Sequence, residues 1–247
     1  MNIIEKQKIE IEFWRDSVQE SPESDSIYNI ITKMRDSIVF VDCLNRYADR
    51  FGIAKKAVEL GSGQGWASCI YKRLFPETHI TTSDISKFAI QSLPKWEHIW
   101  NVKIDNSYAC KSYETKESAS SVDLIFCFAA AHHFAAHNRT FREIERILKP
   151  GGIAFYLYEP ACPKWVHSFA YQRVNKKRPS VPEDVLISSK IIELAQRNNL
   201  NVKLDYYPSL LQRGVIETIY YYVLNRVPFF QRVLPCTTNF IFVKKDA

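Results

Sequence analysis

The chain has 247 residues and a formal net charge of +6; 46% of its residues are hydrophobic and 24% are charged. This balance is typical of a globular protein and excludes collagen, coiled coils and wholesale disorder. The six cysteines show no paired or regular spacing, and neither a secretion signal nor a membrane-spanning apolar run is visible, so we expect reduced thiols and a cytoplasmic location.

Residues 3–20 and 26–50 carry apolar side chains at helical spacing, and we expect two amphipathic helices that cap the fold. From residue 56 onward, short apolar runs alternate with helical patterns. Strands are expected at residues 56–60, 79–83, 100–104, 122–128, 153–158, 202–206 and 239–243. Helices are expected at residues 66–75, 87–93, 141–148 and from about 180 to 199. The alternation predicts an α/β fold, with a parallel sheet covered by helices on both faces.

Two of these helices have candidate start signals. Thr140 and Glu143 match a capping box for the helix that follows the fourth strand. Ser180 and Glu183 flank Pro182, a residue favoured in the first turn of a helix. We therefore expect one helix to begin near Thr140 and the other near Pro182.

Three of the seven glycines lie in the string GSGQG at residues 61–65, directly after the first expected strand. Glycines there let the backbone approach a ligand at the N-terminus of a helix; the alternative is a tight turn that needs positive φ. Trp66 stands where a dinucleotide fingerprint requires its third glycine, and no lysine of a phosphate-binding loop follows. Glu59, just before the glycines, favours a ligand with an amine and a sulfonium over a pyrophosphate.

Asp84 ends the second expected strand. A carboxylate at this place accepts hydrogen bonds from two ribose hydroxyls, and the neighbouring Ile85 is able to pack on an adenine face. The alternative is that Asp84 caps a helix beginning near Ser86. Because Asp84 occurs together with the glycine string, we favour the ligand interpretation.

Four segments resemble class I S-adenosylmethionine-dependent methyltransferases of the small-molecule, type 11-like branch. They are VELGSGQG (58–65), SDIS (83–86), VDLIFCFAAAHHF (122–134) and FREIERILKPGG (141–152). The resemblance implies a Rossmann-like, seven-stranded, mostly parallel sheet and methyl transfer from S-adenosyl-L-methionine. It implies one domain over residues 1–247, with a helical cap (1–50), a cofactor-binding core (51–160) and substrate-side elements with the last strands (161–247).

The resemblance also assigns cofactor-binding residues by position. Glu59, Gly61, Ser62, Gly63 and Gly65 are expected to hold the methionine end of the cofactor, and Asp84 is expected to bind its ribose. Ile85, Phe128 and Ala129 are expected to line the cofactor. Asp105, the nearest acid, is expected to contact the adenine, with residues 111–113 as an alternative.

His132 and His133 follow the fourth expected strand, and Glu159 ends the fifth. These two strands are expected to be neighbours, so His133 and Glu159 are our candidate catalytic pair, an imidazole base oriented by a carboxylate. The alternative is that His132, His133 and His137 serve packing or a helix start. His133 and His137 also have the spacing of a metal pair, but without a third ligand at known spacing we expect no metal.

A hydroxyl acceptor needs such a base, so we expect O-methylation of a small molecule. The alternatives are a nucleic-acid (RNA) methyltransferase, a non-catalytic nucleotide-binding protein of the same fold, and a reductase, which Trp66 disfavours. The aromatic segment 219–234 is expected to be buried in the core or in a homodimer interface, with peripheral membrane contact as the lesser alternative.

Overall fold

The computed structural model describes residues 2–176, 181 and 183–245. Its strands are β1 (Lys56–Leu60), β2 (His79–Asp84), β3 (Asn106–Ala109), β4 (Val122–Phe128), β5 (Leu148–Cys162), β6 (Leu186–Ile187), β7 (Leu200–Tyr206) and β8 (Cys236–Lys244). Its α-helices are α1 (Ile3–Asp16), α2 (Ile27–Arg46), α3 (Ala48–Phe51), α4 (Trp66–Leu74), α5 (Lys87–Gln91), α6 (Leu93–Trp100), α7 (His137–Ile147), α8 (His167–Asn175), α9 (Ser188–Arg197), α10 (Val215–Arg226) and α11 (Pro228–Val233). Two short 3-10 helices are η1 (Ala131–His133) and η2 (Lys164–Val166).

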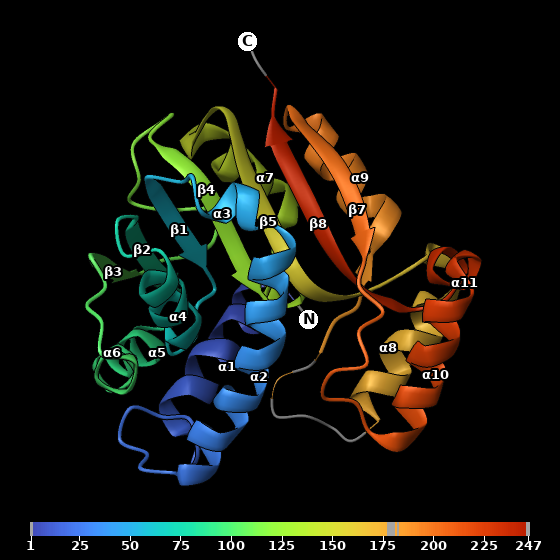
Figure 1. The fold of residues 1–247 in the computed structure, drawn as a ribbon, viewed down its shortest axis with the longest axis horizontal. Helices are drawn as coiled ribbons and strands as arrows, with labels where there is room; N and C mark the ends of the chain where they lie inside the picture. The colour runs from blue at the N-terminus through green and yellow to red at the C-terminus, as the bar shows by residue number, and fades with distance from the viewer. Residues whose placement is uncertain (1, 177–180, 182, 246–247) are drawn as a thin grey trace.

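The strands form one sheet in the order β3-β2-β1-β4-β5-β8-β7, and the short β6 pairs with β5 off this path. The pairs among β1 to β5 are parallel, whereas β8 is antiparallel to both β5 and β7. The predicted α/β fold is therefore confirmed, with a Rossmann-like, mostly parallel path of seven strands and β6 as an addition. Because β1 to β5 run in parallel, the loops after β1, β2, β4 and β5 meet at one end of the sheet (Figure 1).

Successive residues of β1 point to opposite faces of the sheet, as strand geometry requires. Ala57 belongs to a core cluster with side chains of α2, α3, α4 and α6. Val58 and Leu60 belong to a second cluster with side chains of α7 and α9. Helices thus bury both faces of the sheet, which is why its strands read as nearly continuous apolar runs.

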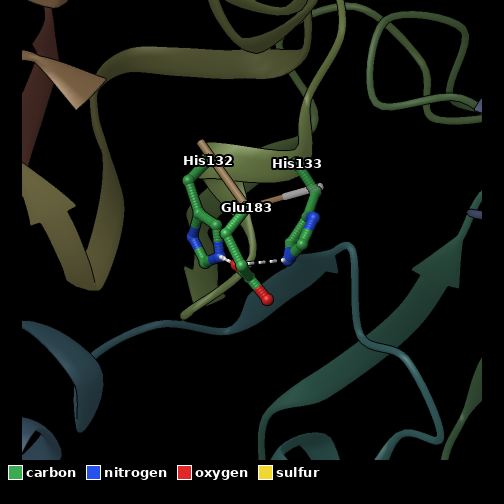
Figure 2. A group of neighbouring side chains, drawn as sticks. All are labelled: His132, His133 and Glu183. Carbon is green, nitrogen blue, oxygen red and sulfur yellow. Dashed lines mark hydrogen bonds and ion pairs between the residues drawn. The ribbon is translucent and has the colours of Figure 1, made fainter. Parts of the chain in front are cut away.

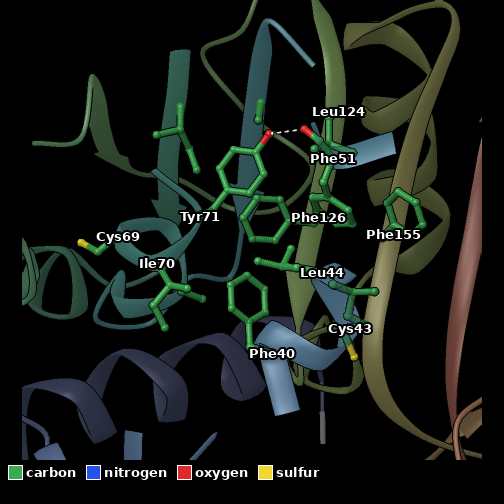
Figure 3. Close-up of a cluster of buried hydrophobic side chains, with 14 of the residues drawn as sticks. Phe40, Cys43, Leu44, Phe51, Cys69, Ile70, Tyr71, Leu124, Phe126 and Phe155 are labelled. Carbon is green, nitrogen blue, oxygen red and sulfur yellow. Dashed lines mark hydrogen bonds between the residues drawn. The ribbon is translucent and has the colours of Figure 1, made fainter. Parts of the chain in front are cut away.

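The first cluster is rich in aromatic rings. Figure 3 shows Phe40 of α2 and Phe51 of α3 packed with Tyr71 of α4 against Phe126 and Phe155 of the sheet. The Tyr71 hydroxyl donates a hydrogen bond to the Phe51 carbonyl oxygen at 3.0 Å, so its buried polar atom is satisfied. This packing fixes α4, and with it the loop that leads from β1 into α4.

The third strand is not where the sequence pattern predicts it. Residues up to Trp100 continue α6, and Asn101 ends that helix in the left-handed region with φ +50°. The strand next to β2 is instead Asn106–Ala109, which is largely exposed and carries little apolar signal. The prediction for residues 100–104 is therefore wrong, because the apolar side chains there belong to the end of a helix and its connection.

Both predicted helix starts are wrong. Helix α7 begins at His137, and Thr140 lies within it, donating to the Ala136 carbonyl oxygen. The Glu143 carboxylate accepts from Thr115 instead of capping the helix. Ser180 and Pro182 lie outside the described residues; Glu183 precedes β6, and α9 begins only at Ser188.

The aromatic segment 219–234 forms α10 and α11, which lie with α8 on the far side of the molecule from α4, α5 and α6 (Figure 1). Ile219 is 63% exposed and Phe229 is 64% exposed, whereas Leu224 is buried. The prediction that this segment as a whole is buried in the core is therefore wrong.

Across the described part of the chain, the structure contains no helix with the length and apolarity that a membrane crossing requires.

Candidate functional site

A cavity of about 440 Å³ opens where the loops after β1, β2, β3 and β4 meet beside Tyr158 of β5. In open α/β sheets, ligands bind in the crevice at the carboxyl ends of the strands. Helix α1 packs against α5 and lines the cavity. The α1 residues that line it are Gln7, Glu10, Phe13 and Trp14.

The loop after β1 turns through the left-handed region, with φ +68° at Gly61 and +54° at Gly63. A side chain at Gly63 would also approach the Trp14 ring to 3.0 Å, so the loop is tight on the side of α1. Gly61, Ser62 and Gly63 line the cavity, as predicted for a ligand loop. Gly65 does not: a Cβ there would lie 2.6 Å from Leu93, which places it beneath the loop at the start of α4.

Asp84 and Ile85 reach the same cavity from the end of β2. The buried Asp84 carboxylate accepts hydrogen bonds from the backbone N–H of Gly63 at 2.9 Å and of Ser86 at 2.8 Å. It therefore joins the glycine loop to the backbone just before α5. Because Ser86 is the N-cap of α5, the helix-cap alternative is wrong, and the ribose contact stays a prediction. Burial raises the pKa of Asp84 to about 7, against the opposing effect of these two hydrogen bonds.

Besides Gly65, two more predicted cofactor residues, Glu59 and Asp105, lie outside the cavity lining. The Glu59 side chain is 2% exposed and accepts a hydrogen bond from Ser68 of α4, behind the glycine loop. Burial raises the pKa of Glu59 to about 8. Asp105 accepts from the Ile80 N–H at 2.8 Å, near the opposite end of β2 from Asp84, so its assignment to an adenine contact is wrong.

The alternative adenine segment does approach the cavity. Cys110 and Ser112 line it, and the Tyr113 hydroxyl accepts a hydrogen bond from Gln7 of α1 at 2.9 Å. This segment follows β3, whose end lies beside Asp84 in the sheet. Of the predicted segment 111–113, Ser112 lines the cavity, and Cys110 just before it does so too, whereas Asp105 does not.

Phe128 and Ala129 line the cavity at the end of β4, as predicted, together with Tyr158 of β5. The Phe128 and Tyr158 rings stack with centroids 5.6 Å apart and planes 10° from parallel. Ala129 and Tyr158 both have positive φ, +47° and +57°. Non-glycine residues held in this region store strain, and such strain concentrates at ligand sites.

Glu159 is fully buried and caps the 3-10 helix η1. Its Oε1 accepts from the N–H groups of Ala130 and Ala131 at 2.9 and 2.8 Å. Its Oε2 lies 2.7 Å from Nδ1 of His132 and also accepts the His132 backbone N–H. The predicted pairing of Glu159 with His133 is therefore wrong: the carboxylate positions His132 and the loop and does not line the cavity.

His133 does line the cavity, and its carboxylate neighbours come from distant parts of the chain. Its Nδ1 lies 2.8 Å from Oε1 of Glu10 on α1, although not along the axis of a hydrogen bond. Its Nε2 lies 3.5 Å from Oε2 of Glu183. Neither glutamate could be assigned to the site from the sequence, because Glu10 belongs to no motif and Glu183 is interpreted there only as part of a helix start.

His132 lies between two carboxylates. Its Nε2 is 3.0 Å from Oε2 of Glu183, so Glu183 faces both histidines (Figure 2). Although burial acts to lower it, Glu159 and Glu183 raise the pKa of His132 to about 9. His137 instead packs beside the Phe134 and Phe141 rings, which agrees with the packing alternative and removes it from any pair with His133.

The cavity is acidic. Of the described residues that line it, the ionisable carboxylic acids are Glu10, Glu20, Asp36, Asp84 and Glu183, and the lysine is Lys33. Lys33 is itself paired with Glu20 at 3.3 Å. An acidic lining favours a cationic ligand and disfavours phosphate-rich ones.

Residues 58–156 match the family model described as a methyltransferase domain. The matched range runs from β1 into β5 and contains the glycine loop, Asp84 and both histidines. None of the curated proteins matches the chain.

Several solved structures share the fold. Geranyl diphosphate C-methyltransferase from Streptomyces coelicolor A3(2), in complex with Mg²⁺, geranyl diphosphate and S-adenosyl-L-homocysteine, has a TM-score of 0.66 at 12% identity, covering 99% of this chain and 100% of that chain. Phosphoethanolamine N-methyltransferase 2 from Haemonchus contortus, in complex with S-adenosyl-L-methionine, has a TM-score of 0.64 at 14% identity, covering 96% of this chain and 60% of that chain. The [4+2]-cyclase SpnF has a TM-score of 0.62 at 12% identity, covering 83% of this chain and 81% of that chain.

Proposed function

We propose that this chain, a class I S-adenosylmethionine-dependent methyltransferase, transfers the methyl group to the hydroxyl of a small-molecule acceptor. One observation carries the proposal. One cavity is lined by the glycine loop and Asp84, which we call its donor end, and by His133, which we call its acceptor end. Donor and acceptor would therefore meet in the same cavity, which is what a direct transfer requires.

The loop after β1 and Asp84 would hold the methyl donor. Gly61, Ser62 and Gly63 present backbone near the space where the methionine end would lie, and the Asp84 carboxylate keeps lone pairs for ribose hydroxyls beyond its two backbone hydrogen bonds. S-adenosyl-L-methionine supplies an activated methyl group on a positively charged sulfur. The acidic lining of the cavity suits that charge.

His133 would act on the methyl acceptor. A hydroxyl loses its proton as its oxygen takes the methyl group, and Nε2 of His133 is the candidate base for that proton. Glu10, beside Nδ1, would stabilise the resulting imidazolium. Glu159 enters this proposal as a positioning residue, because it holds the η1 turn on which His133 lies.

The acidic cavity also weighs against an RNA substrate, since phosphates would be repelled there. A non-catalytic role, or a reaction like that of the neighbouring cyclase, remains the alternative that an experiment has to exclude. All six cysteines are free and five of them are buried, which supports the expected cytoplasmic location. A single domain with a helical cap also remains our proposal.

The test has a binding arm and a turnover arm. Calorimetry of the full chain should show binding of S-adenosylmethionine and S-adenosylhomocysteine and none of NAD. Transfer of labelled methyl to a panel of hydroxyl, amine and carbon acceptors should favour hydroxyls. His133→Gln should lower kcat by roughly 10²–10⁴-fold, the usual contribution of a general base, while S-adenosylhomocysteine affinity stays near wild type.

His98→Gln is the matched control, because His98 is an exposed histidine on α6 away from the cavity, and its turnover should be unchanged. Preferred labelling of amines or carbon acceptors, or full turnover by His133→Gln, would refute the hydroxyl and base assignments. NAD binding without S-adenosylmethionine binding would refute the donor.

A further inference from the structure

His132, His133 and Glu183 bring three ligand-type atoms together at the acceptor end of the cavity (Figure 2). The two Nε2 atoms and a Glu183 carboxylate oxygen all lie within 4.8 Å of one another. Both imidazoles point their Nε2 atoms at the same carboxylate from consecutive positions of η1. This set differs from the His133 and His137 pair considered from the sequence, because His132 takes the place of His137 and Glu183 is brought near only by the fold.

The distances suit a bound ion. Zinc lies about 2.0–2.1 Å from imidazole nitrogen and about 2.0–2.2 Å from carboxylate oxygen, so tetrahedral ligands around it are about 3.3 Å apart. Oε2 of Glu183 is 3.0 Å from His132 Nε2 and 3.5 Å from His133 Nε2, on either side of that value. Both distances to Glu183 Oε2 thus lie within a few tenths of an ångström of that separation.

The other nitrogen of each imidazole faces a carboxylate. Nδ1 of His132 lies 2.7 Å from Glu159, and Nδ1 of His133 lies 2.8 Å from Glu10. Metal-ligating histidines commonly use their second nitrogen in this way, because the carboxylate fixes the tautomer and directs the Nε2 lone pair at the ion. The support is complete for His132, which is hydrogen-bonded to Glu159; Glu10 lies at the same range from His133 but makes no hydrogen bond with it.

Charge and access agree with this arrangement. Glu10, Glu159 and Glu183 surround two imidazoles, and Lys6, whose Nζ donates to the His132 carbonyl oxygen, supplies one opposing charge. The site is therefore acidic, and a divalent ion bound there would displace the proton that His132 holds between Glu159 and Glu183. His133 and Glu183 both line the cavity, so an ion held there would have an open position toward it.

We propose that His132, His133 and Glu183 form a binding site for one divalent transition-metal ion of the Zn²⁺ type, with Glu159 and Glu10 orienting the two imidazoles. Imidazole nitrogen and carboxylate oxygen are ligands that suit zinc and its neighbours. The ion takes the Nε2 lone pair of His133. This last point rests on the proposed function: ion binding and proton acceptance at His133 exclude each other, so Zn²⁺ inhibits hydroxyl methylation.

The experiment uses Co²⁺ as a spectroscopic probe on the full chain. Co²⁺ should bind with a stoichiometry of one and give visible absorption bands, and Zn²⁺ should abolish them. Glu183→Gln and His133→Ala each remove a ligand and should weaken Zn²⁺ binding by at least about a hundredfold, whereas Glu10→Gln removes a supporting carboxylate and should weaken it about 10–100-fold. Glu12→Gln is the matched control on α1, because Glu12 pairs with Lys8 outside the cavity lining, and its affinity should be unchanged.

Two results would overturn the site. One is that neither ion binds at micromolar concentration to chain that still binds S-adenosylhomocysteine; the His132 interactions would then be ion pairs only. The other is that Glu183→Gln and His133→Ala, with unchanged circular dichroism, bind the ions as the wild type does. Absence of S-adenosylhomocysteine binding would instead count against the proposed function, and the metal titration would stand by itself.

Discussion

Cofactor binding should release a proton from Asp84. Burial raises the pKa of this carboxyl to about 7 in the free chain, so Asp84 is protonated in roughly nine-tenths of the molecules at pH 6. Two ribose hydroxyls donating to the carboxylate would favour its ionised form and return the pKa to about 4 or lower. Binding at pH 6 should therefore release about 0.9 proton, and affinity should rise about tenfold between pH 5 and pH 6.

The assay is calorimetric titration of S-adenosylhomocysteine at pH 6 in buffers of different ionisation enthalpy, such as phosphate and imidazole. The observed enthalpy should depend on the buffer with a slope near one released proton. Asp84→Asn cannot ionise, so it should bind more weakly and lose the slope. Asp105→Asn, outside the cavity lining, should keep both affinity and slope. A wild-type enthalpy that does not vary with buffer, with equal affinity at pH 5 and pH 7, would refute the reasoning.

Two further predictions concern stability. Glu159→Gln places a donating amide among the backbone N–H groups whose hydrogen bonds Glu159 now accepts, and it leaves the His132 imidazolium without its buried carboxylate. The variant should therefore lose about 3–5 kcal/mol of unfolding free energy, measured by urea denaturation. A loss below about 1 kcal/mol would contradict this. Glu59 has a folded-state pKa of about 8, which is above its unfolded value. Its contribution to the free energy of unfolding is therefore complete below about pH 4.5 and falls by about 4 kcal/mol as the pH rises to 8. Glu59→Gln keeps an acceptor for Ser68 and should flatten this pH dependence, leaving the variant more stable than wild type at pH 9; equal pH profiles would show that Glu59 is already ionised in the folded chain.

The parts of the site that the sequence predicts are local. A glycine that needs positive φ after a strand can be read from the chain, because no other residue takes that conformation at so little cost. Asp84 can be read in the same way, since it ends a strand that must lie next to β1. Parallel pairing then brings Gly63 and Asp84 within hydrogen-bond distance, as the contact between them confirms.

The sequence also indicates acids and imidazoles without deciding their partners. His132 and His133 are adjacent, yet their rings have different carboxylates on Nδ1, because the turn of η1 sends one toward β5 and the other toward α1. Glu59 and Asp105 had the right chemistry for a ligand, but one is buried behind the loop and the other lies at the wrong end of a strand.

What the chain determines by itself is therefore the backbone pattern: alternating strands and helices, the glycine turn and the acid after the second strand. What the tertiary structure decides is the set of side chains that converge from distant segments. Glu10 arrives on α1, and Glu183 arrives on the segment before β6. Local propensity and hydrophobic period act over a few residues, whereas these contacts depend on how α1 and the chain before β6 dock on the sheet, and no short-range signal encodes that docking.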